Sequence, residues 1–139
     1  MTAAVGYVDS ETSTVHFANA GHPYPYHYFA AADELKALEL PSTPLGLSLP
    51  PELQGNWSEA EVCLEAGDFL VFYSDGITDQ QSSSGEFFED ERLEAFLWEN
   101  RKAESSRLIA GLIRSLREFQ GKSSQVDDLT VLVLRMEGE

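Results

Sequence analysis

The chain has 139 residues, and its nine Lys and Arg against 24 Asp and Glu give a formal net charge of −15. Hydrophobic residues make up 42% of it, which excludes a disordered chain and suits one domain or part of one. A surface of this charge repels nucleic-acid phosphates and anionic lipids, so we expect no nucleic-acid partner. The acidity either serves solubility or reflects carboxylates that converge on a cation, and composition leaves both explanations open.

The sequence shows no sign of export or of membrane insertion. No apolar run approaches the length of a membrane span, and the N-terminus lacks the basic and apolar regions of a signal peptide. Cys63 is the only cysteine, so an intrachain disulfide is impossible, which fits a reducing compartment. The alternation over residues 60–64 predicts that Cys63 is a core residue rather than a nucleophile. We therefore expect a cytoplasmic chain.

The first part of the chain has the pattern of β-structure. Two short β-prone runs flank a polar turn at residues 9–13, which predicts a hairpin. The stretch 40–56, rich in proline and glycine, predicts a loop packed across the sheet. The nearly continuous apolar run at residues 69–73 is typical of a strand buried on both faces. The expected strands are residues 3–8, 14–19, 24–30, 35–40, 60–64 and 69–73.

The second part predicts two helices and a closing strand. Asp90 can cap a first helix with one apolar face. A longer helix is expected over residues 104–119, where apolar residues recur at helical spacing, and Gly121 stands where a C-terminal cap is required. The alternating run 129–136 predicts the last strand. This order favours an α+β fold, an antiparallel β-sandwich flanked by helices.

Two aspartates stand at predicted strand ends. Asp75 follows the strand at 69–73, and Asp127 precedes the strand at 129–136. If those strands are antiparallel neighbours, both carboxylates fall on the same edge of the sheet. Carboxylates held close together repel unless a proton or a cation intervenes, and Mg²⁺ and Mn²⁺ prefer oxygen ligands. Gly76 would let backbone and water approach closely.

Plainer explanations of these residues stay open at this point. Asp-Gly is a common turn pair, and Asp127 with Asp128 can simply cap a loop. His22, in the run Gly21-His22-Pro23, is more typical of a hydrogen-bonded loop anchor than of a ligand. Spacing alone does not decide between a metal site and ordinary turns.

Several motifs in order resemble the SpoIIE/RsbU-like branch of the PPM-type phosphatases, which are bacterial, Mg²⁺- or Mn²⁺-dependent protein serine/threonine phosphatases. Their joint order and spacing are specific, and the match covers nearly the whole chain. The matching segments are residues 18–25 (the family's NAGHPPP block), 43–46 (PLG), 65–79 (PGD and LLLYTDGVTE), 85–88 (GEXFG) and 125–130 (QXDDIT).

The resemblance gives roles to particular residues. It makes Asp75 and Asp127 ligands of Mn²⁺ or Mg²⁺, with Gly76 completing the Asp-Gly motif. Asp128 takes the position next to the last ligand and is not expected to bind the metal itself. His22 falls in a signature loop that we interpret as structural. No catalytic residue beyond the metal ligands is implied.

The sequence departs from the family's pattern in three places. Asp79 replaces the usual Glu, and Phe88 replaces the usual Gly, which are minor changes. The family's domain also begins well upstream, with another Asp and an Asp-Gly motif whose aspartate bridges two metals, whereas residues 75–76 are the only Asp-Gly in this chain. We therefore expect residues 1–139 to be the C-terminal part of a single phosphatase domain, incomplete at the N-terminus, that supplies about half of a two-metal site.

The resemblance implies a function for the complete domain. A metal-activated water would hydrolyse phosphoserine or phosphothreonine on a phosphorylated regulatory protein, such as an anti-sigma factor antagonist, in bacterial signalling. The isolated chain is expected to be inactive, because half of the metal site is missing. The alternative is a non-catalytic, partner-binding phosphatase relic without the bridging aspartate. A third interpretation is an acidic structural module that binds no metal.

Overall fold

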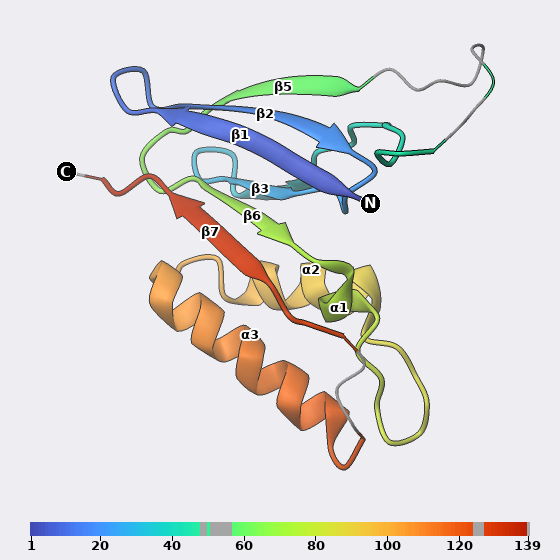
Figure 1. Ribbon diagram of the computed structural model, residues 1–139. Helices are drawn as coiled ribbons and strands as arrows, with labels where there is room; N and C mark the ends of the chain where they lie inside the picture. The colour runs from blue at the N-terminus through green and yellow to red at the C-terminus, as the bar shows by residue number, and fades with distance from the viewer. Residues whose placement is uncertain (48–49, 51–56, 124–126, 139) are drawn as a thin grey trace.

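The computed structural model describes residues 1–47, 50, 57–123 and 127–138. Within them, two antiparallel sheets face each other and helices lie against one of them (Figure 1). The expected α+β fold, an antiparallel sandwich flanked by helices, is confirmed. The expected loop at 40–56 lies partly outside the described residues.

The first sheet has the strand order β1-β2-β5. β1 and β2 form the expected hairpin, with Tyr7 opposite His16. The turn between them is closed by the Asp9 carboxylate, which accepts the Glu11 backbone N–H at 2.9 Å, and this hydrogen bond lowers the pKa of that carboxyl. The strands of this sheet are β1 (Ala3–Asp9), β2 (Thr14–Ala20) and β5 (Ser58–Cys63).

The second sheet has the strand order β4-β3-β6-β7, and all its pairs are antiparallel. β6 is the apolar run of the sequence and is flanked on both sides, which explains why it is almost continuously buried. In β6 and β7, Tyr73 lies opposite Val131, so the end of one strand meets the start of the other. The strands are β3 (Tyr26–Phe29), β4 (Glu34–Ala37), β6 (Phe69–Tyr73) and β7 (Val131–Arg135).

The helices cover the outer face of the second sheet (Figure 1). They are α1 (Asp75–Thr78), α2 (Glu89–Glu99) and α3 (Ser105–Gln120). The apolar stripe of α3 packs Leu108, Leu112 and Leu116 into the core, as its spacing predicts. Gly121 ends the helix with φ +58°, the left-handed conformation that favours glycine, so the expected C-terminal cap is confirmed.

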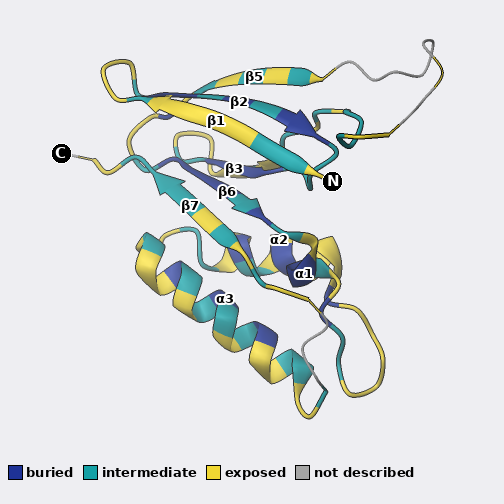
Figure 2. Cartoon of the chain, in the orientation of Figure 1, coloured by how far each residue is buried: buried dark blue, intermediate teal, exposed yellow. Residues whose placement is uncertain are grey.

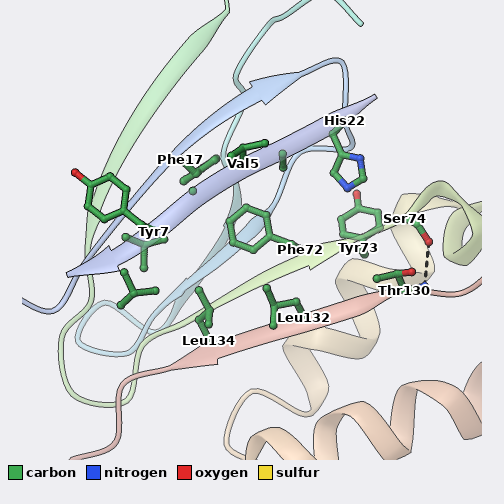
Figure 3. A pocket seen from close by; sticks show the side chains of 14 residues that line it. Val5, Tyr7, Phe17, His22, Phe72, Tyr73, Ser74, Thr130, Leu132 and Leu134 are labelled. Atoms are coloured by element: carbon green, nitrogen blue, oxygen red, sulfur yellow. Dashed lines mark hydrogen bonds between the residues drawn. The ribbon is translucent and has the colours of Figure 1, made fainter. Parts of the chain in front are cut away.

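The sheets meet through a second, smaller core. Phe17 of β2 packs edge-on against Phe72 of β6, with ring centroids 5.1 Å apart. The sandwich is open along the side formed by β1 and β7, where an apolar hollow of about 390 Å³ contains Phe72 and Leu134 (Figure 3). The described residues also leave the outer face of the first sheet uncovered (Figure 2). Tyr7 lies there and is 65% exposed.

Two local expectations are wrong, and one element was not expected. Cys63 is exposed, not in the core, because the alternation of β5 places it on the outward face with Glu59 and Glu61. Asp90 is not the cap of α2: the helix begins one residue earlier, at Glu89, and the Asp90 carboxylate instead accepts the Tyr73 hydroxyl at 2.8 Å. The strand at 69–73 leads into the single turn of α1, which the Asp-Gly pair does not predict.

Candidate metal centre

The pairing of β6 with β7 places two aspartates on one edge of the second sheet. The strands are antiparallel and Tyr73 pairs with Val131, so the chain leaving β6 runs beside the chain entering β7. Asp75 lies two residues beyond the end of β6, and Asp127 lies four residues before β7. The condition on which the sequence argument depended, antiparallel neighbouring strands, is therefore met.

Ser74 fixes the two segments to each other just beyond the paired strands. Its backbone N–H donates to the Thr130 carbonyl at 3.0 Å, and the Thr130 N–H donates back to the Ser74 hydroxyl at 3.0 Å (Figure 3). The same hydroxyl donates to the Asp128 carbonyl at 3.1 Å. These three hydrogen bonds lie just beyond the last paired residues of β6 and β7. They hold together the two segments that carry the aspartates.

Gly76 allows those segments to approach closely. A Cβ at this position would lie 2.3 Å from the Asp128 carbonyl oxygen, a distance that no side chain tolerates. It would also lie 3.5 Å from the Cβ of Asp127, so the Asp127 side chain leaves the backbone directly beside Gly76. The glycine is needed here for space, since its φ is not in the left-handed region.

The aspartates of this edge are exposed at the surface, and they are Asp75, Asp127 and its neighbour Asp128. Asp75 opens α1, and its carbonyl accepts the Asp79 N–H at 2.8 Å, which closes the single helical turn. The Asp127 carboxylate accepts the Asp128 N–H at 2.7 Å, a hydrogen bond to the next residue of its own segment. Exposed carboxylates on adjacent segments are oxygen donors of the kind that Mg²⁺ and Mn²⁺ accept.

The donor set is nevertheless small. In the part of the chain that the structure describes, no group of three or more His, Cys, Asp or Glu side chains could hold a metal ion. A hard cation held by Asp75 and Asp127 would therefore have only these two carboxylates from the described residues. Octahedral coordination requires the remaining positions to be filled by water or by groups from outside the described residues.

A hollow of about 680 Å³ adjoins Asp75 and is lined on its other sides by residues of several elements. Tyr26 and Tyr73 stack in it with ring centroids 5.9 Å apart, and Tyr73 donates to Asp90. Burial, followed by the negative charges of Asp90 and nearby glutamates, raises the pKa of Tyr26 to about 12. The hollow is therefore aromatic and negatively charged.

His22 also lines this hollow, on the loop between β2 and β3. The side chain of Asn19 holds the backbone of His22 from both sides: Oδ1 accepts the His22 N–H at 2.8 Å, and Nδ2 donates to the His22 carbonyl at 3.0 Å. Gly21 has φ +67° and lies against Pro44, and its N–H donates to Ser42. This loop is built by the Asn19 side chain, and His22 lines both this hollow and the apolar hollow along β1 and β7.

The sequence pattern singles out Asp75 and Asp127 but neither Ser74 nor Asn19. Both missed residues are small polar side chains that bond to backbone groups close to a motif, which is common in any loop. Ser directly before an Asp-Gly at a strand end, and Asn three residues before a histidine, are the only local signals. The partners of Ser74, at Thr130 and Asp128, lie more than 50 residues away and follow only from the pairing of β6 with β7.

Comparison with known proteins shows which protein family the chain resembles. Residues 1–137 match the family model described as stage II sporulation protein E (SpoIIE). The phosphoserine phosphatase RsbU of Bacillus subtilis is 28% identical over 119 residues, which cover 86% of this chain and 34% of that protein.

Among the described residues, no helix has the length and apolarity needed to cross a bilayer.

Two solved structures have the same fold over nearly the whole chain. The SiaA-PP2C domain of Pseudomonas aeruginosa matches with a TM-score of 0.78 and 22% identity, covering 98% of this chain and 52% of that one. The phosphatase domain of the cell fate determinant SpoIIE from Bacillus subtilis matches with a TM-score of 0.72 and 17% identity, covering 99% of this chain and 57% of that one. The chain thus spans about a third of the curated relative and little more than half of the solved domains.

Proposed function

The chain belongs to the SpoIIE family of PP2C-type phosphatase domains, and from that membership we propose that its residues 1–139 are the C-terminal part of a metal-dependent protein phosphatase domain. The reaction is hydrolysis of phosphoserine or phosphothreonine on a phosphorylated regulatory protein, such as an anti-sigma factor antagonist, in bacterial signalling. The name of the relative RsbU, a phosphoserine phosphatase, supports the substrate class.

In this proposal, Asp75 and Asp127 hold Mn²⁺ or Mg²⁺. A bound divalent cation lowers the pKa of water and neutralises charge on phosphoryl oxygens. The chain's own residues supply the geometry: Ser74 fixes the β6 exit to the β7 entry, and Gly76 lets the two aspartate segments touch. Asp128 contributes its backbone carbonyl to that contact and is not a ligand.

The observation that carries the proposal is the contact at Gly76. It brings Asp75 and Asp127, which are 52 residues apart in the sequence, onto adjoining segments whose spacing leaves no room for a side chain between them. A pair of unrelated turns would not need this approach. Two carboxylates that converge there would repel each other unless a cation lies between them.

A calorimetric titration of the chain with Mn²⁺ tests the assignment. We expect Asp75→Asn and Asp127→Asn each to weaken Mn²⁺ binding at least tenfold, since each removes one charged ligand. Asp79→Asn is the matched control, because Asp79 is an exposed aspartate one helical turn from Asp75, and Asp128→Asn is a second control. Undiminished binding in both ligand variants, or equal loss in the controls, would contradict it.

A second candidate function is that of a non-catalytic partner-binding module. It is favoured by the small donor set, since the described residues offer no third metal-binding side chain. The two functions differ in turnover: the first requires metal-dependent hydrolysis once the remaining part of the domain is supplied, and the second predicts none.

A further inference from the structure

The hollow beside Asp75 is lined by His22, whose backbone is held by a buried side chain. Asn19 is only 1% exposed, and both polar atoms of its amide are used to hold the backbone of His22. A buried amide that makes two hydrogen bonds to one residue restricts that residue's backbone strongly. Such pre-positioning is the usual requirement for a side chain that contacts a ligand.

One nitrogen of the His22 ring lies at the outer limit of hydrogen-bonding distance from Thr2. Its Nδ1 lies 3.5 Å from the hydroxyl of Thr2, and Thr2 follows Met1, whose backbone pairs with Leu45 through hydrogen bonds of 2.8 and 3.1 Å. Among the described residues, Nε2 of His22 has no hydrogen-bond partner. An imidazole held through one nitrogen presents the other as a donor or an acceptor.

The negative charge of the hollow makes a hydrogen-bond donor such as Nε2 of His22 important for binding an anion. Its lining includes Asp75 and Asp90 but no Lys or Arg. A phosphomonoester carries about two negative charges, and it therefore needs hydrogen-bond donors to approach such a wall. Among the residues that line the hollow, His22 carries the only side-chain nitrogen that can donate a hydrogen bond.

We propose that Nε2 of His22 donates a hydrogen bond to the phosphoryl group of a phosphoserine or phosphothreonine bound beside Asp75. The inference rests on the proposed function, since it assumes that a phosphomonoester reaches this edge of the sheet. His22 is then a substrate-binding residue, and Asn19 is the residue that positions it. The anchoring of the loop is done by the Asn19 amide and not by the imidazole.

Nuclear magnetic resonance of the isotope-labelled chain tests this directly. With Mg²⁺ present, inorganic phosphate and then a phosphoserine peptide are titrated while the ring nitrogens of the three histidines are followed. We expect the Nε2 signal of His22 to move, while those of His16, on the outer face of the first sheet, and His27, in the core, stay in place. Equal movement of all three rings, or a response to Mg²⁺ alone with none to phosphate, would overturn the proposal.

The backbone amides of residues 74–76 separate this proposal from the function on which it rests. If those amides respond to the peptide and the His22 ring does not, the role of His22 is refuted and the phosphatase site stands. If neither responds, both fail.

A pair of variants adds a quantitative check. His22→Gln should raise the dissociation constant for the phosphoserine peptide about tenfold, as expected for loss of one hydrogen bond to a charged group. His16→Gln is the control and should leave the constant unchanged. An unchanged constant in His22→Gln, with its fold intact by circular dichroism, would contradict a contact between His22 and the phosphoryl group.

Discussion

Gly76 shows how one missing Cβ can decide whether two distant segments meet. Any side chain there would clash with the Asp128 carbonyl, which is backbone and cannot rotate away. We predict that Gly76→Ala lowers the free energy of unfolding by about 1–3 kcal/mol, the usual cost of overpacking, and also weakens Mn²⁺ binding. Gly138→Ala is the control, because its Cβ would meet only Ala66 at an ordinary 3.8 Å. Urea unfolding of both variants, combined with the metal titration, measures the two effects, and equal stability of the variants would contradict this packing.

His27 and Asp68 form the buried polar pair of the smaller core. His27 Nε2 lies 3.3 Å from the Asp68 carboxylate, which also accepts the N–H groups of Ala30 and Glu65 at 2.7 and 3.1 Å. Burial lowers the pKa of His27 below its usual value, although Asp68 opposes this shift.

A lowered histidine pKa makes stability depend on pH in a defined direction. The unfolded chain binds the proton more readily than the folded one, so the contribution of His27 is present above about pH 6.5, the ordinary histidine pKa, and is lost as the pH falls below it. We predict that His27→Gln reduces the loss of stability between pH 7 and pH 5, measured by urea unfolding, while His16→Gln does not. A steeper loss in His27→Gln would show that Asp68 dominates and raises the pKa instead.

At the scale of elements, α3 and β6 have the most predictable structure. Their apolar patterns specify both element type and buried face, since a stripe at helical spacing and a continuous apolar run each have one favourable packing. The exit from β6 is less predictable: α1 is a single turn held by Asp79 and Ile77 N–H bonds, too short to leave a periodic signal. The strand-end position of Asp75 and Asp127 was visible in the sequence, whereas their proximity depended on a pairing that only the folded sheet defines.

The covering of the second sheet by α3 is testable by truncation. Leu112 is completely buried between the helix and the sheet, so Leu112→Ala should cost about 2–5 kcal/mol of unfolding free energy through lost burial and the cavity left behind. Arg114→Ala, two residues along the same helix on its exposed face, should change stability by less than about 0.5 kcal/mol. Similar costs for both would mean that the stripe does not face the sheet.

For the whole molecule, the two sheets differ in how they are covered. The second sheet is packed by α2 and α3, whereas the described residues leave Val5 and Tyr7 of the first sheet 70% and 65% exposed (Figure 2). The hollow along β1 and β7 is apolar (Figure 3). Exposed apolar surface of this kind marks a contact with further protein. We propose that the contact is made by the part of the phosphatase domain that the matched structures have beyond this chain.

The proposed metal centre also depends on the rest of the phosphatase domain, and this dependence determines the activity that we expect. In the proposed site, Asp75 and Asp127 would hold one hard cation loosely, with water in the remaining positions. Hydrolysis by a two-metal site needs a second ion about 3.5–4 Å away and a group that bridges both. We therefore predict that the 139-residue chain alone does not turn over a phosphomonoester at a useful rate.

The most direct test of the account is Mn²⁺-dependent hydrolysis of a phosphoserine peptide by the chain alone and by the chain with the remaining part of the domain restored. We predict no turnover by the chain alone, turnover after restoration, and loss of that turnover in Asp75→Asn and Asp127→Asn but not in Asp79→Asn. Metal-dependent turnover by the chain alone, or turnover in the restored domain that survives Asp75→Asn, would contradict the assignment of the site.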